Sequence, residues 1–443
     1  MKCIVVGAGL AGSQAALYLA KAGIKVDLYE MRPNKTTGAH TSSDFAEFVC
    51  SNSLGAKDIT GASGLLKEEA RLLGSVLIEA AHMHSVPSGN SLSIDRVGFS
   101  KYITKLIEEN ENINIIRQEF TKIPKDIPII IATGPLTSDI LCEEIKNLTG
   151  EKDFHFFDAI APIVKKESID FDKAFYASRW DKGEADYINC PMTKEEYENF
   201  YQILTTAEKI PTKNFEAKYF EGCMPIEVLA SRGVDTLRFG PMKPVGLFDK
   251  RTKQPEHKNY QFYAVVQLRQ DDKEAQLYNL VGFQTNLKWG EQKKLLQAIP
   301  GLENVEIVRY GVMHANTFIN SPNLLNKTLQ SKFNPNIFFA GQITGTEGYS
   351  ESIATGLFAA INMKRYLSGE KLIELSSKSM LGALLEYITY PEHKNFQPIN
   401  SNWGIVEKPE MDKKLRKNKQ EKNSILATQA LKYIEEIKNG YIC

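Results

Sequence analysis

The chain has 443 residues, of which 42% are hydrophobic and 24% are charged, a composition typical of a globular protein with two or three domains. Its 54 basic side chains balance its 54 acidic ones, which excludes a global electrostatic field that would attract nucleic acid. Because no apolar run approaches the roughly 18 residues of a membrane span, and because Met1 leads straight into a predicted strand rather than a signal peptide, we expect a cytoplasmic protein that does not contact membranes.

The first predicted element is a short apolar strand, residues 3–6, that runs directly into a glycine-rich turn and then into an Ala/Leu-rich helix over residues 15–22. A buried strand, a tight glycine turn and a helix N-terminus are typical of a pyrophosphate site, because the glycines let the backbone approach the ligand and the helix N–H groups hold the anion. The residues of this turn, all predicted to bind the cofactor, are Gly7, Ala8, Gly9, Leu10, Ala11 and Gly12. The chain therefore begins with a predicted dinucleotide-binding fold.

The second predicted strand, residues 24–30, ends in the carboxylate of Glu30. Glu30 follows Gly12 at close to the spacing of about 20 residues expected for a carboxylate that binds the ribose hydroxyls of a dinucleotide. Arg32 lies at the same strand end and is also a predicted cofactor-binding residue.

Residues 36–64 are polar and rich in Gly, Ser and Thr. Such a segment early in a nucleotide-binding domain predicts a loop over the cofactor, and this loop carries Cys50 and Ser53, the latter a predicted cofactor-binding residue. Helices are expected after it, over residues 65–73 and 97–109.

The next predicted strands are residues 114–117 and 128–134, and the second of them ends in three residues predicted to bind the cofactor, Ala132, Thr133 and Gly134. In flavoproteins of the glutathione-reductase type, a strand that ends this way closes over the dinucleotide. After a GxGxxG turn and an acidic strand end, this triplet favours FAD rather than NAD as the bound ligand.

Residues 151–330 have a different pattern of predicted secondary structure from the residues before them. Strand-like segments at 260–268 and 277–283 alternate with helical ones such as 194–208. This alternation predicts an α+β insertion that carries the substrate side of the site.

The nucleotide-binding pattern then resumes with a predicted strand, residues 336–342, and a glycine-rich segment that opens a helix over residues 353–367. The N–H groups at the start of this helix suit a cofactor phosphate or the carbonyl oxygens of an isoalloxazine ring. The residues of this element predicted to bind the cofactor are Gly341, Gln342, Glu347, Gly348, Ser352 and Ile353.

These elements predict an α/β protein with a Rossmann-like FAD-binding domain of the glutathione-reductase type. The domain would be built from residues 1–150 and 331–443, with the α+β insertion domain at 151–330 between them. The tail contains a basic run, residues 413–422, that is either a solvated helix face or an element that contacts phosphates. None of the six cysteines forms a CxxC pair, so we expect no metal site, and a catalytic cysteine would act as a single thiolate.

Four strings of residues resemble signatures of the folate- and FAD-dependent tRNA uracil-5-methyltransferases, the TrmFO family. They are residues 45–53 (FAEFVCSNS), 220–225 (FEGCMP), 239–247 (FGPMKPVGL) and 339–352 (FAGQITGTEGYSES), with shorter matches at 265–271 and 282–285. The similarity covers nearly the whole chain. The chain departs from the family where it has Gly55 and Ala315 in place of the common Arg, and Thr346 and Ser350 in place of the usual Val. These departures leave open whether the RNA is transfer RNA or ribosomal RNA.

The resemblance implies methylation of uridine C5 in a structured RNA, either in the T loop of transfer RNA or in ribosomal RNA. FAD would be the cofactor, and methylenetetrahydrofolate and NAD(P)H would be co-substrates. C5 of uracil is a poor nucleophile until a thiolate adds at C6, so the reaction needs a positioned cysteine. By resemblance, Cys223 is that nucleophile, and a basic residue, Arg232 or Lys243, would help to keep it ionised.

The resemblance also implies roles for four further residues. Cys50 would be a catalytic thiol close to the isoalloxazine, and Tyr349 would stack on folate or flavin. His314 and Arg269 would bind folate or the substrate.

Three other functions remain open at this point. The first is a flavoprotein of the glucose-inhibited-division type that modifies wobble uridines of transfer RNA. The second is a flavin oxidoreductase that acts on a small molecule. The third is a non-catalytic RNA-folding flavoprotein, whose function would survive Cys223→Ala.

Overall fold

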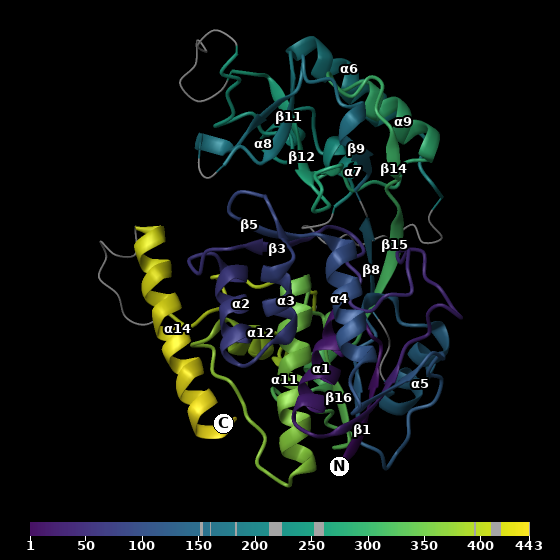
Figure 1. The fold of residues 1–443 in the computed structure, drawn as a ribbon, viewed down its shortest axis with the longest axis vertical. Coiled ribbons are helices and arrows are strands. Elements are labelled where there is room, and N and C mark those ends of the chain that lie inside the picture. The colour runs from purple at the N-terminus through teal and green to yellow at the C-terminus, as the bar shows by residue number, and fades with distance from the viewer. Residues whose placement is uncertain are drawn as a thin grey trace.

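A computed structural model describes most of the chain and shows two domains, with the N- and C-terminal segments in the lower one (Figure 1). The described residues are 1–150, 154–159, 161–181, 184–211, 224–251, 261–393, 396–408 and 418–442, without the side chains of 154–159 and 313–315. Cys223, the side chain of His314 and part of the basic run 413–422 therefore lie outside the described residues.

The lower domain is built on a sheet of five parallel strands in the order β16-β7-β1-β2-β6. The strands are β1 (Lys2–Val6), β2 (Lys25–Tyr29), β6 (Ile113–Ile116), β7 (Ile129–Ile131) and β16 (Ile337–Phe339). Most of their apolar, largely β-branched side chains are buried, as expected for a parallel sheet covered on both faces. Because β16 pairs with β7, the two ends of the chain complete one nucleotide-binding sheet, and the predicted Rossmann-like fold is confirmed.

Helices α1 (Leu10–Lys21) and α11 (Tyr349–Leu367) follow β1 and β16 and pack against each other. The predicted start of α11, Ile353, is wrong by four residues, because Gly348 has a φ of 117° and lets the chain enter the helix at Tyr349. The remaining helices of this domain are α2 (Ala62–Leu72), α3 (Val76–Met83), α4 (Arg96–Glu108), α5 (Asp139–Thr149), α10 (Ser321–Leu324), α12 (Met380–Thr389) and α14 (Lys419–Tyr441).

The segment 36–64 is not only a loop, which corrects the prediction made from its polar composition. It contains strand β3 (Ser53–Ala56), which joins β5 (Ser91–Ile94) and β4 (Ser85–Val86) in a small antiparallel sheet. Phe45 and Phe48 are fully buried in the core of the lower domain.

The upper domain is an α+β unit whose sheet has six antiparallel strands in the order β10-β11-β12-β13-β9-β14. The strands are β9 (Ile163–Lys165), β10 (Phe175–Ala177), β11 (Tyr187–Met192), β12 (Ala264–Gln270), β13 (Leu277–Leu280) and β14 (Ile307–Arg309), and the helices are α6 (Lys194–Thr206), α7 (Ile226–Ser231), α8 (Thr236–Phe239) and α9 (Trp289–Gln297). Their apolar side chains form a second core.

An antiparallel pair of strands, β8 (Phe154–Ala159) and β15 (Met313–Phe318), runs between the two domains (Figure 1). The sequence places the end of the insertion at residue 330, whereas the buried side chains of Phe318, Leu325 and Leu329 belong to the core of the lower domain. No described helix is both long enough and apolar enough to cross a membrane.

Candidate active site

The turn between β1 and α1 is shaped by two glycines that tolerate no side chain. Gly7 has a φ of 90°, and a Cβ on Gly12 would lie 1.7 Å from the carbonyl oxygen of Gly7. A Cβ on Gly9 would meet no described atom within 4 Å, so the turn is open on that side. No side chain caps the N-terminus of α1, which leaves its first N–H groups for an anion. This arrangement fits the pyrophosphate of FAD.

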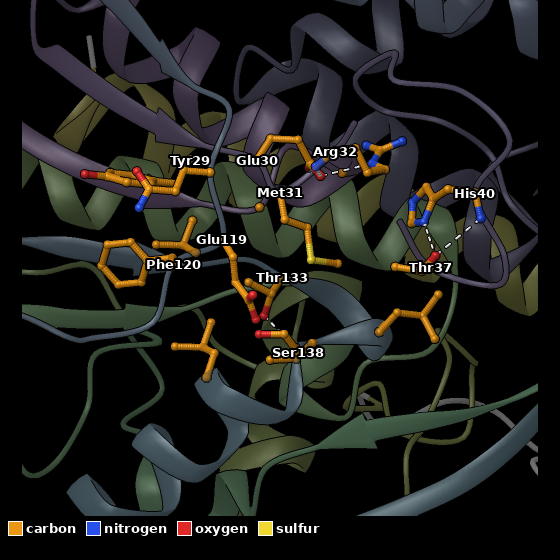
Figure 2. A pocket seen from close by; sticks show the side chains of 17 residues that line it. Tyr29, Glu30, Met31, Arg32, Thr37, His40, Glu119, Phe120, Thr133 and Ser138 are labelled. Carbon is orange, nitrogen blue, oxygen red and sulfur yellow. Dashed lines mark hydrogen bonds and ion pairs between the residues drawn. The ribbon is translucent and has the colours of Figure 1, made fainter. Parts of the chain in front are cut away.

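Next to this turn is a cavity of about 550 Å³ that Glu30, Arg32 and His40 help to line (Figure 2). Glu30 Oε2 accepts a hydrogen bond from the backbone N–H of Ala8 at 3.0 Å, and Oε1 accepts from Nε of Arg32 at 3.0 Å. Burial acts to raise the pKa of Glu30, but the charge and hydrogen bonds of Arg32 outweigh it and hold the pKa below its usual value. The carboxylate is thus ionised, as recognition of ribose hydroxyls requires.

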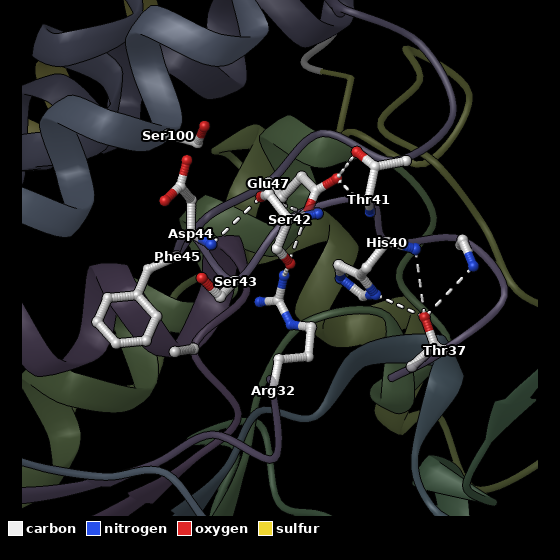
Figure 3. Close-up of polar contacts among 12 residues, drawn as sticks. Arg32, Thr37, His40, Thr41, Ser42, Ser43, Asp44, Phe45, Glu47 and Ser100 are labelled. Atoms are coloured by element: carbon white, nitrogen blue, oxygen red, sulfur yellow. Dashed lines mark hydrogen bonds and ion pairs between the residues drawn. The ribbon is translucent and has the colours of Figure 1, made fainter. Parts of the chain in front are cut away.

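Arg32 is 1% exposed and lies between two carboxylates, those of Glu30 and Glu47. Figure 3 shows Arg32 with Glu47 and its other polar neighbours. Its Nη1 donates to Glu47 Oε2 at 3.1 Å, and the hydroxyl of Thr41 donates to Glu47 Oε1 at 2.7 Å. His40 lies nearby, and burial together with the charge of Arg32 lowers its pKa to about 4, so its ring is neutral at pH 7. Sequence reasoning missed Glu47 and His40 as site residues, because neither belongs to a nucleotide-binding motif.

Two further cavities adjoin this one, and the three together form a groove that leads away from Glu30. The first, of about 550 Å³, is lined by Gly9, Ala132, Thr133, Gly134, Gly341, Gln342, Tyr349 and Ser352 among others. The second, of about 850 Å³, is lined by Cys50, Ser53, Gln342, Glu347, Gly348 and Tyr349 among others. Consecutive cavities share wall residues, so the groove leads from the glycine turn to the N-terminus of α11, which no side chain caps. An elongated dinucleotide fits this path.

Cys50 and Tyr349 meet where this groove ends. The Tyr349 hydroxyl lies 2.9 Å from Cys50 Sγ and accepts hydrogen bonds from the backbone N–H groups of Cys50 at 2.7 Å and Ser51 at 3.3 Å. Burial and the neighbouring Cys50 raise the pKa of Tyr349 well above its usual value, so the phenol keeps its proton at neutral pH. The Tyr349 ring packs 4.5 Å from that of Phe48, centroid to centroid.

A fourth cavity, of about 880 Å³, opens between the two domains, and Cys50 and Ser51 line both this cavity and the one of about 850 Å³. The walls of the fourth cavity include Cys50 and Ser51 from the lower domain and Met224, Pro241, Arg269 and Gly282 from the upper one. Among the described residues that line it, Arg269 is the cation, and Arg269 Nε is buried without a hydrogen-bond partner in the described part of the chain. A buried guanidinium N–H without an acceptor suits an anionic or carbonyl oxygen of a substrate.

A buried polar network beside this cavity joins the two domains. Arg96 donates to Asp271 Oδ1 from Nη2 at 2.7 Å and from Nε at 3.1 Å. Asn279 donates to the same carboxylate oxygen at 2.9 Å, and its own amide oxygen accepts from Arg269 at 3.3 Å. Asn52 donates to the carbonyl oxygen of Gln270 at 2.8 Å. The network fixes Arg269 relative to the strand that follows Cys50.

The structure therefore brings most of the predicted site residues to one groove. Ile353 is an exception, since its side chain is buried in the core of the lower domain and lines none of the four cavities. Arg232 and Lys243, the predicted basic partners of Cys223, are exposed and line none of these cavities either. No group of three or more potential metal ligands occurs among the described residues.

Comparison with known proteins gives a consistent set of relatives. The family described as glucose inhibited division protein A matches residues 2–371. A methylenetetrahydrofolate–tRNA-(uracil-5-)-methyltransferase TrmFO from Bacillus cereus (strain G9842) is 55% identical over 437 residues, which are 98% of each chain. A protein of the same name from Caldicellulosiruptor bescii is 54% identical over 441 residues, 99% of each chain. GidA from Aquifex aeolicus aligns with a TM-score of 0.70 at 17% identity, covering 98% of this chain and 73% of that chain, which shows a shared fold.

Proposed function

The chain belongs to the glucose inhibited division protein A family and, within it, to the TrmFO methyltransferases, and we propose that it methylates C5 of a uridine in transfer RNA with a carbon from methylenetetrahydrofolate. One observation carries this proposal. The dinucleotide groove ends at Cys50, and the cavity between the domains begins at the same residue. A flavin in the groove and a base in the cavity would thus meet at one sulfur atom.

The residues that would hold FAD are those that shape the groove. The Gly7–Gly12 turn and the N–H groups of α1 would bind the pyrophosphate, Glu30 the ribose, and Gln342 with the N-terminus of α11 the isoalloxazine end. Bound FAD would supply the electron transfer and one-carbon chemistry that no side chain can provide.

Cys50 and Tyr349 would handle a proton at the end of the flavin groove. The Tyr349 oxygen accepts two backbone N–H groups, so its own proton is free to be donated to the sulfur, 2.9 Å away. A proton can pass between these two atoms without movement of either side chain. Such a pair suits removal of the C5 proton of uracil after the new C–C bond has formed: Cys50, as the thiolate that accepts the Tyr349 hydrogen bond, would take the proton.

Cys223 is the proposed nucleophile at uracil C6, on the resemblance of residues 220–225 to the family signature. Met224, the next residue in the sequence, lines the cavity between the domains together with Cys50, which supports this role. Addition of a thiolate at C6 moves negative charge to the oxygen on C4. Arg269, buried in the same cavity with an unpartnered Nε, would donate to that oxygen.

Transfer RNA is proposed rather than ribosomal RNA because the relatives that are 55% and 54% identical over almost their full lengths are named for transfer RNA. The nicotinamide reductant is proposed as NAD(P)H, which would visit the flavin transiently, since the sequence has no second GxGxxG turn. Modification of the wobble uridine is the second candidate, favoured by the match to the glucose inhibited division protein A family.

The test uses purified flavoprotein with methylenetetrahydrofolate, NAD(P)H and an unmodified tRNA transcript, and measures 5-methyluridine after digestion. Cys223→Ala should form no 5-methyluridine while keeping its flavin absorbance. Cys142→Ala is the matched control, because Cys142 is buried in α5 and lines none of the four cavities, and it should keep activity. Wild-type protein that binds FAD but forms no 5-methyluridine would refute the proposal.

A further inference from the structure

Two exposed aromatic side chains flank the segment 239–246: Phe239 is its first residue, and Trp180 contacts its last residue, Gly246. Phe239 ends α8 and is 80% exposed, more than any other large hydrophobic side chain in the described part of the chain. Trp180 is 48% exposed and packs against Gly246 near the other end of the segment. The seven residue-to-residue steps from Phe239 to Gly246 span at most about 25 Å.

Trp180 is held rigidly despite its exposure. Its backbone N–H donates to the carbonyl oxygen of Gly246 at 2.7 Å, and its φ of 60° is rare for a non-glycine residue. A Cβ on Gly246 would lie 2.7 to 2.9 Å from three atoms of the indole, so the backbone of Gly246 covers one face of the ring. Arg179 anchors the same turn by donating to the carbonyl oxygen of Val245 at 2.7 Å. The uncovered face of the indole is therefore presented in a fixed position.

The same segment forms part of the wall of the cavity between the domains. Pro241, two residues after Phe239, lines that cavity and packs against Gly282, which lines it too. Lys243, two residues further on, is exposed and makes no ion pair within the part of the chain that the structure describes. Phe239 and Lys243 thus flank Pro241, a wall residue of the cavity that Cys50 also lines, and Trp180 packs against Gly246, three residues after Lys243.

The charges around this segment favour a polyanion. Among the described residues close to it or to Trp180 in the sequence, three ion pairs, Arg238–Asp235, Lys250–Asp181 and Arg251–Asp249, balance each other, and Arg179 and Lys243 add two further positive charges. Arg238 lies over the ring of Tyr263 at 3.5 Å from the centroid, which fixes one cation beside Phe239. Aromatic rings interleaved with cations bind unstacked nucleotides, because the rings stack on bases while the cations meet phosphates.

We propose that Phe239, Lys243 and Trp180 form an RNA-binding rim that holds the nucleotides flanking the target uridine. This proposal rests on the proposed function, which requires a uridine of a folded RNA to leave its stack and enter the cavity. Loop nucleotides next to a flipped base lose a stacking partner. Phe239 and Trp180 replace that partner, and Lys243 contacts the backbone between them.

The experiment measures binding of a fluorescently labelled, unmodified tRNA transcript to the full-length flavoprotein by anisotropy over a range of salt concentrations. Phe239→Ala and Trp180→Ala should each weaken binding roughly tenfold, as expected for the loss of one stacked base. Phe239→Trp keeps an aromatic ring and should restore the affinity. Lys243→Ala should lower the slope of log affinity against log salt by about one.

Trp289→Ala is the matched control. Trp289 is also exposed, but it stacks on Tyr310 at 5.2 Å, and Tyr310 follows the opposite edge strand of the same sheet, β14. This variant should bind RNA like wild type, and all variants should keep wild-type flavin content and NAD(P)H-dependent flavin reduction without RNA.

Unchanged RNA affinity in both Phe239→Ala and Trp180→Ala would refute the RNA-binding role of the rim, even if wild-type protein methylates tRNA. A wild-type protein that binds tRNA through these residues but forms no 5-methyluridine would support the RNA-binding role of the rim and refute the proposed function.

Discussion

Replacing Arg32 by methionine removes the cation that lies between the buried carboxylates of Glu30 and Glu47. The Arg32 side chain is 2% exposed, and those of Glu30 and Glu47 are 7% and 8% exposed. Loss of one partner from a buried ion pair costs about 3 to 5 kcal/mol, because the remaining charge keeps its desolvation penalty. Glu30 keeps the N–H of Ala8, and Glu47 keeps the donors of Thr41. We therefore expect Arg32→Met to lower the free energy of unfolding by about 3 kcal/mol, the lower end of this range.

The loss of stability should depend on pH in a direction that the structure fixes. In the wild type, Arg32 holds the pKa of Glu30 below its usual value, so the stabilisation is present above the unfolded pKa of about 4.3 and is lost as pH falls through the folded pKa. Without the Arg32 guanidinium, burial is opposed only by the backbone N–H groups of Ala8 and residue 32, and it raises the folded pKa of Glu30. The deficit of Arg32→Met should therefore be largest near pH 8 and shrink towards pH 5.

Urea unfolding at fixed FAD concentration, followed by circular dichroism between pH 5 and pH 8, measures this deficit. Arg71→Met is the control, since Arg71 is 44% exposed and its ion pair with Glu68 should contribute under about 0.5 kcal/mol. A deficit below about 1 kcal/mol at pH 8, or one that does not change with pH, would refute the reasoning.

Three further predictions concern other parts of the chain. Gly12→Ala should abolish FAD binding, measured by flavin absorbance, because its Cβ would lie 1.7 Å from the oxygen of Gly7. Tyr349→Phe should destabilise the protein by about 1 to 3 kcal/mol in thermal unfolding, because the backbone N–H of Cys50 loses its acceptor, and it should slow methyl transfer with FAD content unchanged. Burial raises the pKa of Glu69 to about 7, above its unfolded value. In urea unfolding, the free energy of unfolding of wild type should therefore fall by about 3 kcal/mol relative to that of Glu69→Gln as pH rises from 4.5 to 7.

Each of these predictions has an outcome that contradicts it. Gly290→Ala, whose Cβ meets nothing within 4 Å, should keep its FAD, and a Gly12→Ala protein that also keeps FAD would show that the turn adapts. Tyr349→Phe with wild-type turnover would remove Tyr349 from the proton-handling role. A stability difference between wild type and Glu69→Gln that is constant with pH would mean that Glu69 titrates normally when folded.

The nucleotide-binding half of the fold could be predicted because its signals are local. A β-branched strand, a glycine turn and a helix occur within the first 22 residues, and a second such unit begins at residue 336. Polar composition misled the prediction for residues 36–64, because Asn52 is buried there with its amide satisfied by the carbonyl oxygens of Ile94 and Gln270. A hydrogen-bonded polar side chain is invisible to a hydrophobic pattern.

Only those residues of the candidate site that belong to a sequence motif could be predicted. The sequence predicts roles for Cys50 and Tyr349, but their contact joins residues 299 positions apart and depends on packing that no local pattern records. The Arg96–Asp271 ion pair, 175 positions apart, was missed for the same reason. The boundary at residue 330 also differs from the packing, since Leu325 and Leu329 join the core of the lower domain.

The fate of a single carbon atom tests the central claim most directly. Wild-type protein would be incubated with methylenetetrahydrofolate labelled with ¹³C in its methylene group, NAD(P)H and an unmodified tRNA transcript, and the labelled nucleotide would be located by fragment mass spectrometry. The account predicts one labelled methyl group on C5 of a T-loop uridine. Label on the wobble uridine, or tRNA that carries no label although the protein holds FAD, would contradict it.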